Sequence, residues 1–493
     1  MENLGIGFQV AFSISNLIYC FIGVFLGTLV GVLPGIGPAG TIALLLPLSY
    51  GMTPASAIIL LAGIFYGSQY GGSITSILVN IPGEPSTIIT TLDGYQMARQ
   101  GRAGTALGIS AVGSFIAGTF GVLIIMLVAQ PLSRMVLKFG PPEYFSLMVL
   151  ALTFLTYLSS GSTIKAVIMA LLGLALSQIG MDIITGEPRF TFGLLALQDG
   201  IAIVPFVMGI FGVAEVLANV ETPENQEIFS TKMKSVLPTL KDLKDSFPSI
   251  IRGSFIGFFL GLIPGAGVTI SPLLSYGVEK KFSKYPEKFG TGAIEGVAGP
   301  ESANNSASTA NFIPLFILGI PCGGVTALLL GALMIHGLQP GPIMISQNPG
   351  VFWGTVISMY IGNIFLLILN IPLIGLWIKL LRIPYRILFP LILFFCIIGS
   401  YSLLYSKFDV FVMISFGVVG YFLKKFGYQP APLIMGFVLG NLFEKSLRQS
   451  LLMSRGDPSI FLERPISVIC IVTAVILLLS PLFLKYKRIV PRV

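Results

Sequence analysis

The sequence predicts an all-α polytopic membrane protein, built from two inverted-topology repeats with broken or re-entrant helices. Three observations predict this fold class: the chain is strongly apolar, long apolar runs recur, and several landmarks occur twice in the same order. Of the 493 residues, 54% are hydrophobic and 10% are charged, and the mean hydropathy is +0.90. Soluble domains carry about 25% charged residues, so this chain has too few polar side chains for a surface that faces only water.

The apolar runs are long enough to cross a bilayer. A membrane-spanning helix needs roughly 20 apolar residues, and four runs are close to or beyond that length: 106–130, 351–378, 387–404 and 466–484. The runs are continuous instead of alternating, which argues against a β-barrel.

The charges fit a membrane protein better than a nucleic-acid-binding one. The net charge is +8, but the basic residues are scattered between apolar runs and form no single patch. The first 98 residues contain no Lys or Arg, which predicts an N-terminus on the outer side and no cleavable signal peptide. We expect the four cysteines to be buried small hydrophobic residues: Cys20, Cys322, Cys396 and Cys470.

Four landmarks occur twice, which predicts a duplicated chain. "GVLPGIG" (31–37) is followed 230 residues later by "GLIPGAG" (261–267). The other pairs are "NIPGEPS" (80–86) with "GIPCGG" (319–324), "DGYQ" (93–96) with "HGLQ" (336–339), and "VPFVMGIFGVAEV" (204–216) with "APLIMGFVLGNLFEK" (431–445). We therefore expect a first membrane repeat (1–218), a polar cytoplasmic connector (219–250), a second membrane repeat (251–445), and a loop with a C-terminal transmembrane helix (446–493).

Opposite charge in equivalent loops predicts that the two repeats are inverted. The loop after the first Ile-Pro motif contains Arg99 and Arg102, whereas its counterpart, 336–350, has no Lys or Arg. The loop 181–200 is mainly acidic, whereas its counterpart near residue 425 is basic. Under the positive-inside rule, equivalent loops then lie on opposite sides of the membrane. Four basic residues disagree, since they would lie outside: Arg134, Lys138, Arg448 and Arg455.

The paired Pro-Gly motifs are the first candidate site. A helix break in a membrane exposes backbone N–H and C=O groups, which survive only when they face protein or a water-filled cavity. A half-helix N-terminus suits a carboxylate, and unwound carbonyls suit Na⁺. The alternative is a kink or tight helix packing. The residues proposed to line the substrate and ion region here are Pro34, Gly35, Gly37, Pro264, Gly265 and Gly267.

Two clusters of small polar residues lie near these motifs. Hydroxyls and amides can surround an anion or coordinate Na⁺, although the alternative is polar glue between helices. The first cluster and the break that follows it supply Gly71, Gly72, Ser73, Thr75, Ser76, Asn80, Pro82 and Gly83. The second supplies Asn304, Asn305, Ser306 and Ser308.

Few ionisable groups lie within the apolar regions, and such groups are functional candidates. They are Glu84, Lys165, Glu215, Glu295, Glu301 and Glu444. Glu84 and Glu301 lie closest to the candidate site, where each could be an ion ligand, a proton carrier or an interfacial residue. The one histidine, His336, cannot supply a paired-histidine zinc motif, and we expect it in a loop. There is also no nucleophile elbow and no Walker A sequence, so an enzyme is not predicted and transport would use an ion gradient.

These motifs resemble a known family. "GVLPGIGPAGTIALLLPLSYG", "YGGSITSILVNIPGEPS", "DGYQMARQGRAGTALG" and "GLIPGAG…GVAGPESANNSA" are similar to the large, TctA-type membrane subunit of tripartite tricarboxylate transporters, over nearly the whole chain. The resemblance implies a multi-pass secondary transporter of the bacterial inner membrane. It also implies a small TctB-type membrane subunit, an extracytoplasmic TctC-type solute-binding protein, and citrate or a related carboxylate as substrate.

Together these features predict a cation-coupled importer of organic anions that binds no nucleic acid and needs no cofactor apart from Na⁺ or H⁺ as coupling ion. An elevator-like movement of one bundle would suit re-entrant hairpins with polar tips. Three alternatives stay open: a stand-alone cation/organic-anion symporter, a channel, and a membrane scaffold.

Overall fold

The computed structural model describes residues 2–33, 37–158, 162–182, 184–221, 237–265, 267–380 and 385–489. The chain is 80% helical, which confirms the all-α prediction. The described residues contain one small sheet, an antiparallel hairpin of β1 (Gly180–Met181) and β2 (Pro188–Arg189).

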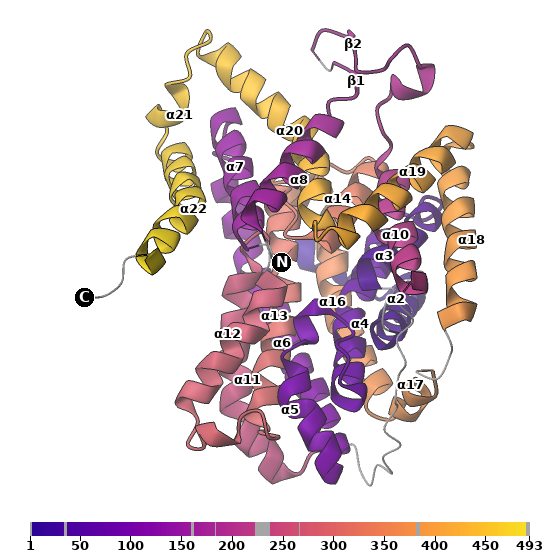
Figure 1. Cartoon of the computed structure of the whole chain (residues 1–493), viewed down its shortest axis with the longest axis vertical. Coiled ribbons are helices and arrows are strands. Elements are labelled where there is room, and N and C mark those ends of the chain that lie inside the picture. Colours follow the sequence, from indigo (N-terminus) through magenta and orange to yellow (C-terminus); the bar gives the residue numbers. More distant parts are fainter. Residues whose placement is uncertain are drawn as a thin grey trace.

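The helices form one bundle that is longer than it is wide (Figure 1). In the first half they are α1 (Glu2–Ala11), α2 (Ile14–Val32), α3 (Gly37–Ser49), α4 (Pro54–Val79), α5 (Thr90–Met97), α6 (Ala103–Val136), α7 (Pro141–Leu158), α8 (Thr163–Leu176), α9 (Ile203–Val207) and α10 (Ala214–Glu221). Short turns of tighter or wider helix join them: η1 (Pro85–Thr87), η2 (Ala98–Arg102), η3 (Leu195–Leu197) and η4 (Met208–Val213).

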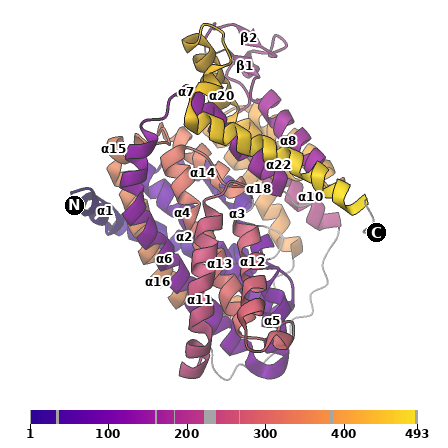
Figure 2. The same cartoon turned by 90° about the vertical axis from the view of Figure 1, so that its left-hand side faces the viewer.

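The second half continues the bundle. Its helices are α11 (Leu240–Gly261), α12 (Gly267–Phe282), α13 (Glu295–Ala310), α14 (Gly324–Ile335), α15 (Met344–Gln347), α16 (Pro349–Asn370), α17 (Ile374–Leu380), α18 (Tyr385–Leu404), α19 (Lys407–Lys425), α20 (Pro430–Met453), α21 (Ile460–Glu463) and α22 (Pro465–Ile489). Two short turns complete it: η5 (Pro286–Lys288) and η6 (Pro314–Leu318). Figure 2 shows α20 and the hairpin at one end of the bundle and α5 at the other.

Five described segments are long and apolar enough to cross a membrane, so the chain is a multi-pass membrane protein. They are Ile14–Val32, Pro54–Val79, Thr90–Val136, Ile203–Glu221 and Pro349–Asn370. Two predicted runs, 106–130 and 351–378, fall on two of these segments. The second is shorter than predicted because α16 ends at Asn370, just before Pro372, which has no N–H to continue a helix. The runs 387–404 and 466–484 correspond to shorter apolar helices, Phe389–Ser402 and Pro465–Leu479.

Helix α4 is the centre of the bundle. The most apolar window of α4 is 100% buried, whereas the equivalent windows of α2 and the α5–α6 segment are 44% buried. A helix that is enclosed on all sides faces protein and not lipid. The polar residues of α4 can therefore be kept away from the hydrocarbon of the bilayer.

Glycines let two helix pairs approach closely, α2 with α4 and α11 with α13. A Cβ atom added to Gly27 of α2 would lie 2.5 Å from the Ile64 carbonyl oxygen, and one added to Gly257 of α11 would lie 2.1 Å from the Ala303 oxygen. The triplet Gly23, Gly27, Gly31 of α2 recurs 230 residues later in α11 as Gly253, Gly257, Gly261. Such small residues at every fourth position are the usual basis of close packing between membrane helices.

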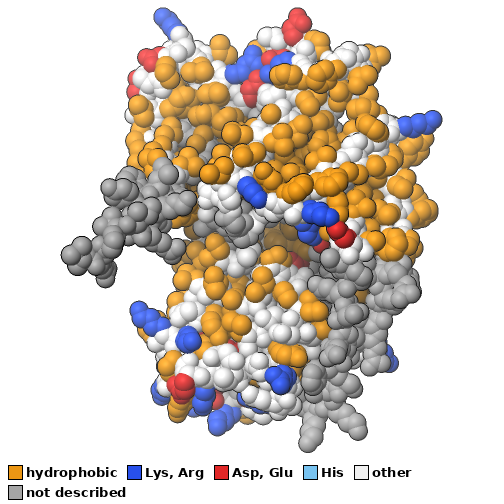
Figure 3. Space-filling view, in the orientation of Figure 1, with side chains coloured by type: hydrophobic (Ala, Val, Ile, Leu, Met, Phe, Trp, Pro, Cys, Tyr) orange, Lys and Arg blue, Asp and Glu red, His pale blue; other side chains and the backbone are white. Residues whose placement is uncertain are grey.

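The surface combines apolar and basic regions. Figure 3 shows hydrophobic side chains over much of the face in view, with Lys and Arg side chains at its lower end, across its middle and, beside Asp and Glu, at its top. The exposed basic residues of α5–α6, α11 and α12 are Arg99, Arg102, Lys241, Lys244, Lys280 and Lys281. All four cysteines are free and buried, as predicted.

The expected connector, 219–250, is only partly a loop. Residues 222–236 lie outside the described residues, and the last part forms the start of α11. That helix begins early because Thr239 is a strong N-cap, with its hydroxyl accepting from the Asp242 N–H at 3.1 Å.

Candidate functional site

The first helix break follows α4. Asn80 ends the helix in a left-handed conformation, with φ 61° and ψ 25°. Ile81, Pro82 and Gly83 then lead into η1, where the Thr87 hydroxyl accepts from the Glu84 N–H at 3.3 Å. Proline has no N–H to donate within a helix, and the threonine satisfies a backbone group that the break exposes.

The same local geometry occurs 239 residues later. Gly319 is left-handed, with φ 69° and ψ 24°, and it precedes Ile320 and Pro321. Thr326, which follows Thr87 by the same interval, accepts from the N–H groups of Cys322 at 2.8 Å and Gly323 at 2.9 Å. Two segments with different sequences thus turn in the same way and use a threonine at the same place.

The second Pro-Gly motif lies against the second Ile-Pro break. The Gly265 N–H donates to the Cys322 carbonyl at 2.9 Å. Gly265 has φ 124°, which favours glycine, and an added Cβ would lie 2.8 Å from the Leu155 Cα. Pro264 precedes it in the same turn, and Gly267 begins α12.

The first Pro-Gly motif lies mainly outside the described residues, which include neither Pro34 nor Gly35. Gly37, the last residue of that motif, begins α3 with φ 59°. Gly83 marks where the first Ile-Pro break lies, since a Cβ added there would be 2.3 Å from the Gly31 carbonyl oxygen near the end of α2.

The segments that follow the breaks cross between the two halves. The turn η1, after the first Ile-Pro break, packs on α12, which follows the second Pro-Gly motif. Helix α14, after the second Ile-Pro break, packs on α3, which follows the first Pro-Gly motif. The elements that follow the breaks of one half therefore pack on elements of the other half.

A buried carboxylate lies where the two polar clusters meet. Glu301 of α13 is 0% exposed, and it accepts hydrogen bonds from hydroxyls on three first-half elements. Ser73 of α4 and Thr90 of α5 donate to its two oxygens, and Ser110 of α6 donates to Oε2 at 3.1 Å. Among the described residues Glu301 has no ion-pair partner. The sequence left its place open, and the structure puts it in the interior, not at an interface with water.

The second polar cluster contributes amides beside Glu301. The Asn305 Nδ2 donates to the Ser114 hydroxyl at 2.7 Å and to the Glu301 backbone oxygen at 3.0 Å. Asn304 is 1% exposed, and neither of its side-chain polar atoms has a hydrogen-bond partner. Because buried polar groups are nearly always paired, an unpartnered amide is a place where a water or a ligand is expected.

A small pocket, about the size that one water molecule needs, lies on the other side of two hydroxyls that hold Glu301, and Glu301 itself does not line it. Ser73 and Ser110, both of which donate to Glu301, line the pocket. Tyr70 and Asn370 also line it, and neither the Tyr70 hydroxyl nor the Asn370 Oδ1 has a hydrogen-bond partner.

Several other predicted residues serve the local backbone or helix packing. Thr75 and Ser76 donate to the Gly72 carbonyl, both at 2.9 Å, and Ser308 donates to the Asn305 carbonyl at 3.0 Å. Gly71 packs against Thr28 and Gly72 against Glu84. The Ser306 hydroxyl donates to the Ser254 carbonyl at 2.7 Å, which joins α13 to α11.

Asp93, from the repeated "DGYQ" landmark, joins the halves at a second buried carboxylate. It is 0% exposed. Its Oδ1 accepts from the backbone N–H groups of Gly290, Gly292 and Ala293 at 2.7–2.9 Å, and its Oδ2 accepts from the Tyr276 hydroxyl at 2.9 Å. Asp93 thus fixes the loop before α13 from the opposite half of the chain.

Most of the other predicted ionisable groups have charged or polar partners. Glu215 pairs with Lys424 at 2.8 Å, and Lys165 donates to the Phe426 carbonyl at 2.6 Å. Glu84 resembles Glu301 in being buried, and its Oε1 has no hydrogen-bond partner. His336 lies in the turn that follows the last residue of α14, where a loop was predicted, and it is half-buried.

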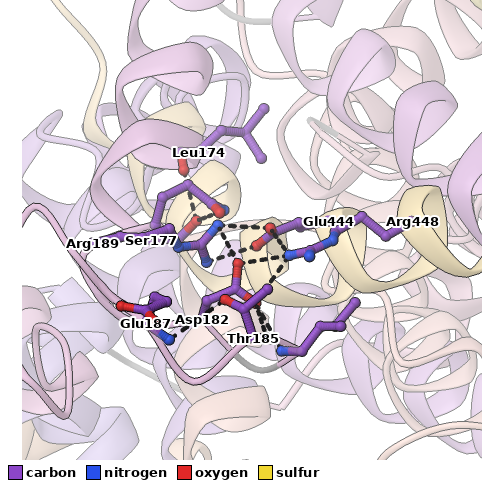
Figure 4. Close-up of polar contacts among 10 residues, drawn as sticks. Leu174, Ser177, Asp182, Thr185, Glu187, Arg189, Glu444 and Arg448 are labelled. Atoms are coloured by element: carbon purple, nitrogen blue, oxygen red, sulfur yellow. Dashed lines mark hydrogen bonds and ion pairs between the residues drawn. The ribbon is translucent and has the colours of Figure 1, made fainter.

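Glu444 belongs to an ion cluster that ties the hairpin to α20 (Figure 4). Arg189 bonds both oxygens of Glu444, at 2.7 and 3.1 Å, and Arg448 bonds Asp182 at 2.8 Å and Glu444 at 3.0 Å. The Thr185 and Ile184 N–H groups and the Arg448 guanidinium hold the pKa of Asp182 well below its usual range. Arg448, which the inverted-repeat hypothesis placed awkwardly outside, is thus neutralised by acidic neighbours.

Sequence reasoning included Ser73 but missed the other two hydroxyls that hold Glu301, those of Thr90 and Ser110. A signal was present, since Ser110 and Ser114 lie four residues apart in an apolar helix and match the spacing of Glu301 and Asn305. Thr90 and Asn370 had no comparable signal, because each is a single polar residue whose partner or pocket lies far away in sequence.

Comparisons with known proteins agree with this architecture. The chain matches the family described as "Tripartite tricarboxylate transporter TctA family" over residues 17–435. A relative from Agrobacterium vitis, named "Uncharacterized 52.8 kDa protein in TAR-I ttuC' 3'region", is 48% identical over 467 residues, covering 95% of this chain and 93% of the relative. A second, "Uncharacterized protein in TAR-II ttuC' 3'region", is 50% identical over 227 residues, covering 45% of this chain and 94% of that relative.

No solved structure matches the chain. The family match covers most of the sequence, and the family consists of transport proteins, not enzymes. The chain therefore belongs to the tripartite tricarboxylate transporter TctA family.

Proposed function

We propose that this protein is the large transmembrane subunit of a binding-protein-dependent secondary transporter in the bacterial inner membrane. It imports tricarboxylates or related organic acids, citrate among them, by symport with Na⁺ or H⁺. The family implies a tripartite system with a TctB-type membrane subunit and a TctC-type binding protein. Delivery of substrate by the binding protein fixes the direction of transport as inward.

The observation that carries this proposal is the recurrence of one break geometry in each half of the chain. The turns at Asn80 and Gly319 differ by 8° in φ and 1° in ψ. Paired broken helices in equivalent positions are typical of secondary transporters built from repeats, whose substrate and ion sites lie where the breaks meet. We infer that the halves arose by duplication, and the opposite charge of equivalent loops favours opposite orientations in the membrane.

In this site, backbone dipoles and neutral side chains hold the carboxylates of the substrate. Helices α3, α12 and α14 begin at the breaks, and helix N-termini present free N–H groups and about half a positive charge. The unpartnered Asn304 amide supplies a donor and an acceptor in the same region. The residues proposed to line the site are Pro34, Gly35, Gly37, Asn80, Pro82, Gly83, Pro264, Gly265, Gly267, Asn304 and Asn305.

The end of the molecule with α5 would face the cytoplasm. Arg99, Arg102, Lys241 and Lys244 are exposed there, and the cytoplasmic ends of membrane proteins are enriched in such residues. The end with the hairpin and α20 would then face the binding protein on the outer side.

The test is uptake of radiolabelled citrate and simple dicarboxylates into proteoliposomes that contain the chain with its two partner proteins. We expect saturable uptake that requires an inward Na⁺ or H⁺ gradient. Uptake that survives collapse of both gradients would contradict the proposal, and unsaturable flux would favour a channel. Uptake by the chain alone would favour a stand-alone symporter.

A pair of glycine variants tests the site itself. Gly265→Ala adds a Cβ against Leu155 in a backbone conformation that disfavours alanine, whereas Gly277→Ala on α12 meets nothing within 4 Å. We expect Gly265→Ala to lose most citrate uptake and Gly277→Ala to retain it, at equal amounts of assembled protein. Equal uptake by both variants would show that the second Pro-Gly break is not part of the substrate site.

A further inference from the structure

We propose that Glu301 and the small pocket beside it form the site of the coupling cation. The site takes one monovalent cation, either Na⁺ bound by oxygen ligands or a proton bound to the Glu301 carboxyl group. This inference rests on the proposed function, because it assigns the cation of that symport to a particular group.

The charge of Glu301 is uncompensated. Glu301 is 0% exposed, and in the described part of the chain neither Lys nor Arg forms an ion pair with it. Two other described carboxylates are at most 1% exposed, and both are compensated: Glu279 pairs with Arg252, and Asp93 accepts three backbone N–H groups. Burying an unpaired charge costs several kcal/mol. A bound cation or a proton removes that cost. The Glu301 carboxylate should therefore bind a cation or a proton strongly, as a coupling site must.

The groups around the Glu301 carboxylate can also bind a cation. The donors to Glu301 are hydroxyls of Ser73, Thr90 and Ser110. A hydroxyl can rotate and present its oxygen to a cation, whereas a backbone N–H cannot. Carboxylate, hydroxyl and amide oxygens are the ligands that hard cations prefer.

The pocket beside these hydroxyls has room for one small ion. Ser73 and Ser110 line it and already contact Glu301. Tyr70 and Asn370, each 3% exposed, line the same pocket with an unpartnered oxygen. The pocket has the size for one water or one small ion, and not for an organic anion, so it is distinct from the substrate site.

The location explains how a cation there could control movement. The three hydroxyls belong to α4, α5 and α6 of the first half, and Glu301 belongs to α13 of the second. Ser73 lies seven residues before the Asn80 break, and α13 leads toward the Gly319 break. Occupancy therefore changes the attraction between two halves whose broken helices form the proposed substrate site.

Other titratable groups near α13 define the controls. The Tyr70 hydroxyl of α4 lines the pocket. Asp93 of α5 and Glu279 of α12 have the partners given above, and α11 contributes Arg252 to the Glu279 pair. The charged residues of α6 and of its first turn lie toward the ends of that helix: Arg102 and Arg134. Glu295 begins α13 and is half-buried. Glu84, beside η1, is buried and has a carboxylate oxygen without a hydrogen-bond partner, so it is the competing candidate.

The test measures cation binding to the full chain in lipid nanodiscs without any organic anion. Radioactive sodium binding is measured at alkaline pH. In parallel, the infrared C=O band of a buried protonated carboxyl is followed from alkaline to acidic pH. The variants are Glu301→Gln, Tyr70→Phe and Glu84→Gln, and the matched control is Glu287→Gln, which makes the same change at an exposed position.

If the cation is Na⁺, we expect Glu301→Gln to weaken sodium binding by roughly tenfold or more, equivalent to about 1.4 kcal/mol. Tyr70→Phe should weaken it severalfold, although the removed hydroxyl has no protein partner. If the cation is H⁺, sodium should not bind, and the carboxyl band of the wild type should be missing in Glu301→Gln and shifted in Tyr70→Phe. Glu84→Gln and Glu287→Gln should match the wild type in either case.

Three results would overturn the proposal: wild-type protein with neither signal, a folded Glu301→Gln variant with both signals unchanged, or loss of the signal in Glu84→Gln instead. Tyr70→Phe keeps the carboxylate and removes one oxygen, so it remains informative if Glu301→Gln does not fold. Because no organic anion is present, a failure of citrate transport with intact cation binding would contradict the importer and leave the cation site standing.

Discussion

Asp93 and Glu301 are both fully buried carboxylates that connect the two halves of the chain, yet they are held by different kinds of donor. Asp93 accepts three backbone N–H groups and one tyrosine hydroxyl. Glu301 accepts three serine and threonine hydroxyls. A backbone N–H can only donate, so it holds an anion permanently, whereas a hydroxyl can donate or accept. Burial alone therefore does not make a carboxylate a cation site. The donors around it decide whether its negative charge is permanently held or can be exchanged between hydroxyls and a cation.

The largest expected effect comes from the packing that positions both carboxylates. Gly257→Val would place a Cβ only 2.1 Å from the Ala303 carbonyl oxygen. This clash would force α11 and α13 apart. We expect a loss of about 3 kcal/mol or more of stability, measured as thermal unfolding in detergent. Gly277→Val, at an open position on α12, should stay close to the wild type. Equal stability of the two variants would show that the close approach of α11 and α13 is unnecessary.

Removing the charge of Asp93 should have the next largest effect. Asp93→Asn weakens three charge-assisted hydrogen bonds to the loop before α13, and we expect it to cost about 1.5–3 kcal/mol of stability. Hydrogen exchange at the N–H groups of Gly290, Gly292 and Ala293 should rise with it. Unchanged exchange there would mean that Asp93 does not fix the loop.

The same isosteric change at Glu301 should act in the opposite direction. Glu301→Gln removes an uncompensated buried charge while keeping groups that can bond to Ser73, Thr90 and Ser110. Replacing buried charges by neutral groups is often neutral or stabilising, so we expect stability within about 1 kcal/mol of the wild type or above it. Thermal unfolding of the two variants, measured side by side, checks this. If Glu301→Gln lost as much stability as Asp93→Asn, the two carboxylates would not differ in the way proposed here.

The smallest effect is expected at the ion cluster of Asp182, where both signs of charge are present and partly solvated. The pKa of Asp182 is lower in the folded protein than in an unfolded chain. Its stabilising contribution is therefore complete above the unfolded value of about 3.9 and declines as the pH falls below it. Hydrogen exchange of the Ile184 and Thr185 N–H groups should increase only in this acidic range. In Asp182→Asn the exchange should be modestly faster at neutral pH and lose that acid dependence.

The sequence was sufficient to predict the helical membrane class and the positions of the breaks. Composition and long apolar runs set the class because a bilayer requires each span to satisfy its own backbone. Proline alone does not predict a break, since Pro47, Pro131 and Pro272 lie inside continuous helices. Pro82, Pro264 and Pro321 lie at breaks beside a residue with positive φ: Asn80, Gly265 and Gly319. Proline together with a neighbouring Gly or Asn is therefore the local signal of these breaks.

The sequence did not identify which polar residues meet. Ser73 and Glu301 are 228 residues apart, and Asp93 and Ala293 are 200 residues apart. Serines and threonines within helices equally often bond to their own backbone, as Thr75 and Ser308 do here. Composition cannot separate these uses, so several hydroxyls predicted for the site serve the helix, while Thr90 and Ser110 were overlooked.

Hydropathy and the Pro-Gly motifs are enough to predict a chain that spans a membrane with interrupted helices, because both act through local backbone chemistry. The N–H groups around Asp93 and the hydroxyls around Glu301 follow instead from the packing of distant segments. Whether a buried carboxylate is locked or exchangeable depends on which donors the fold brings within hydrogen-bond distance, and those donors come from distant parts of the chain.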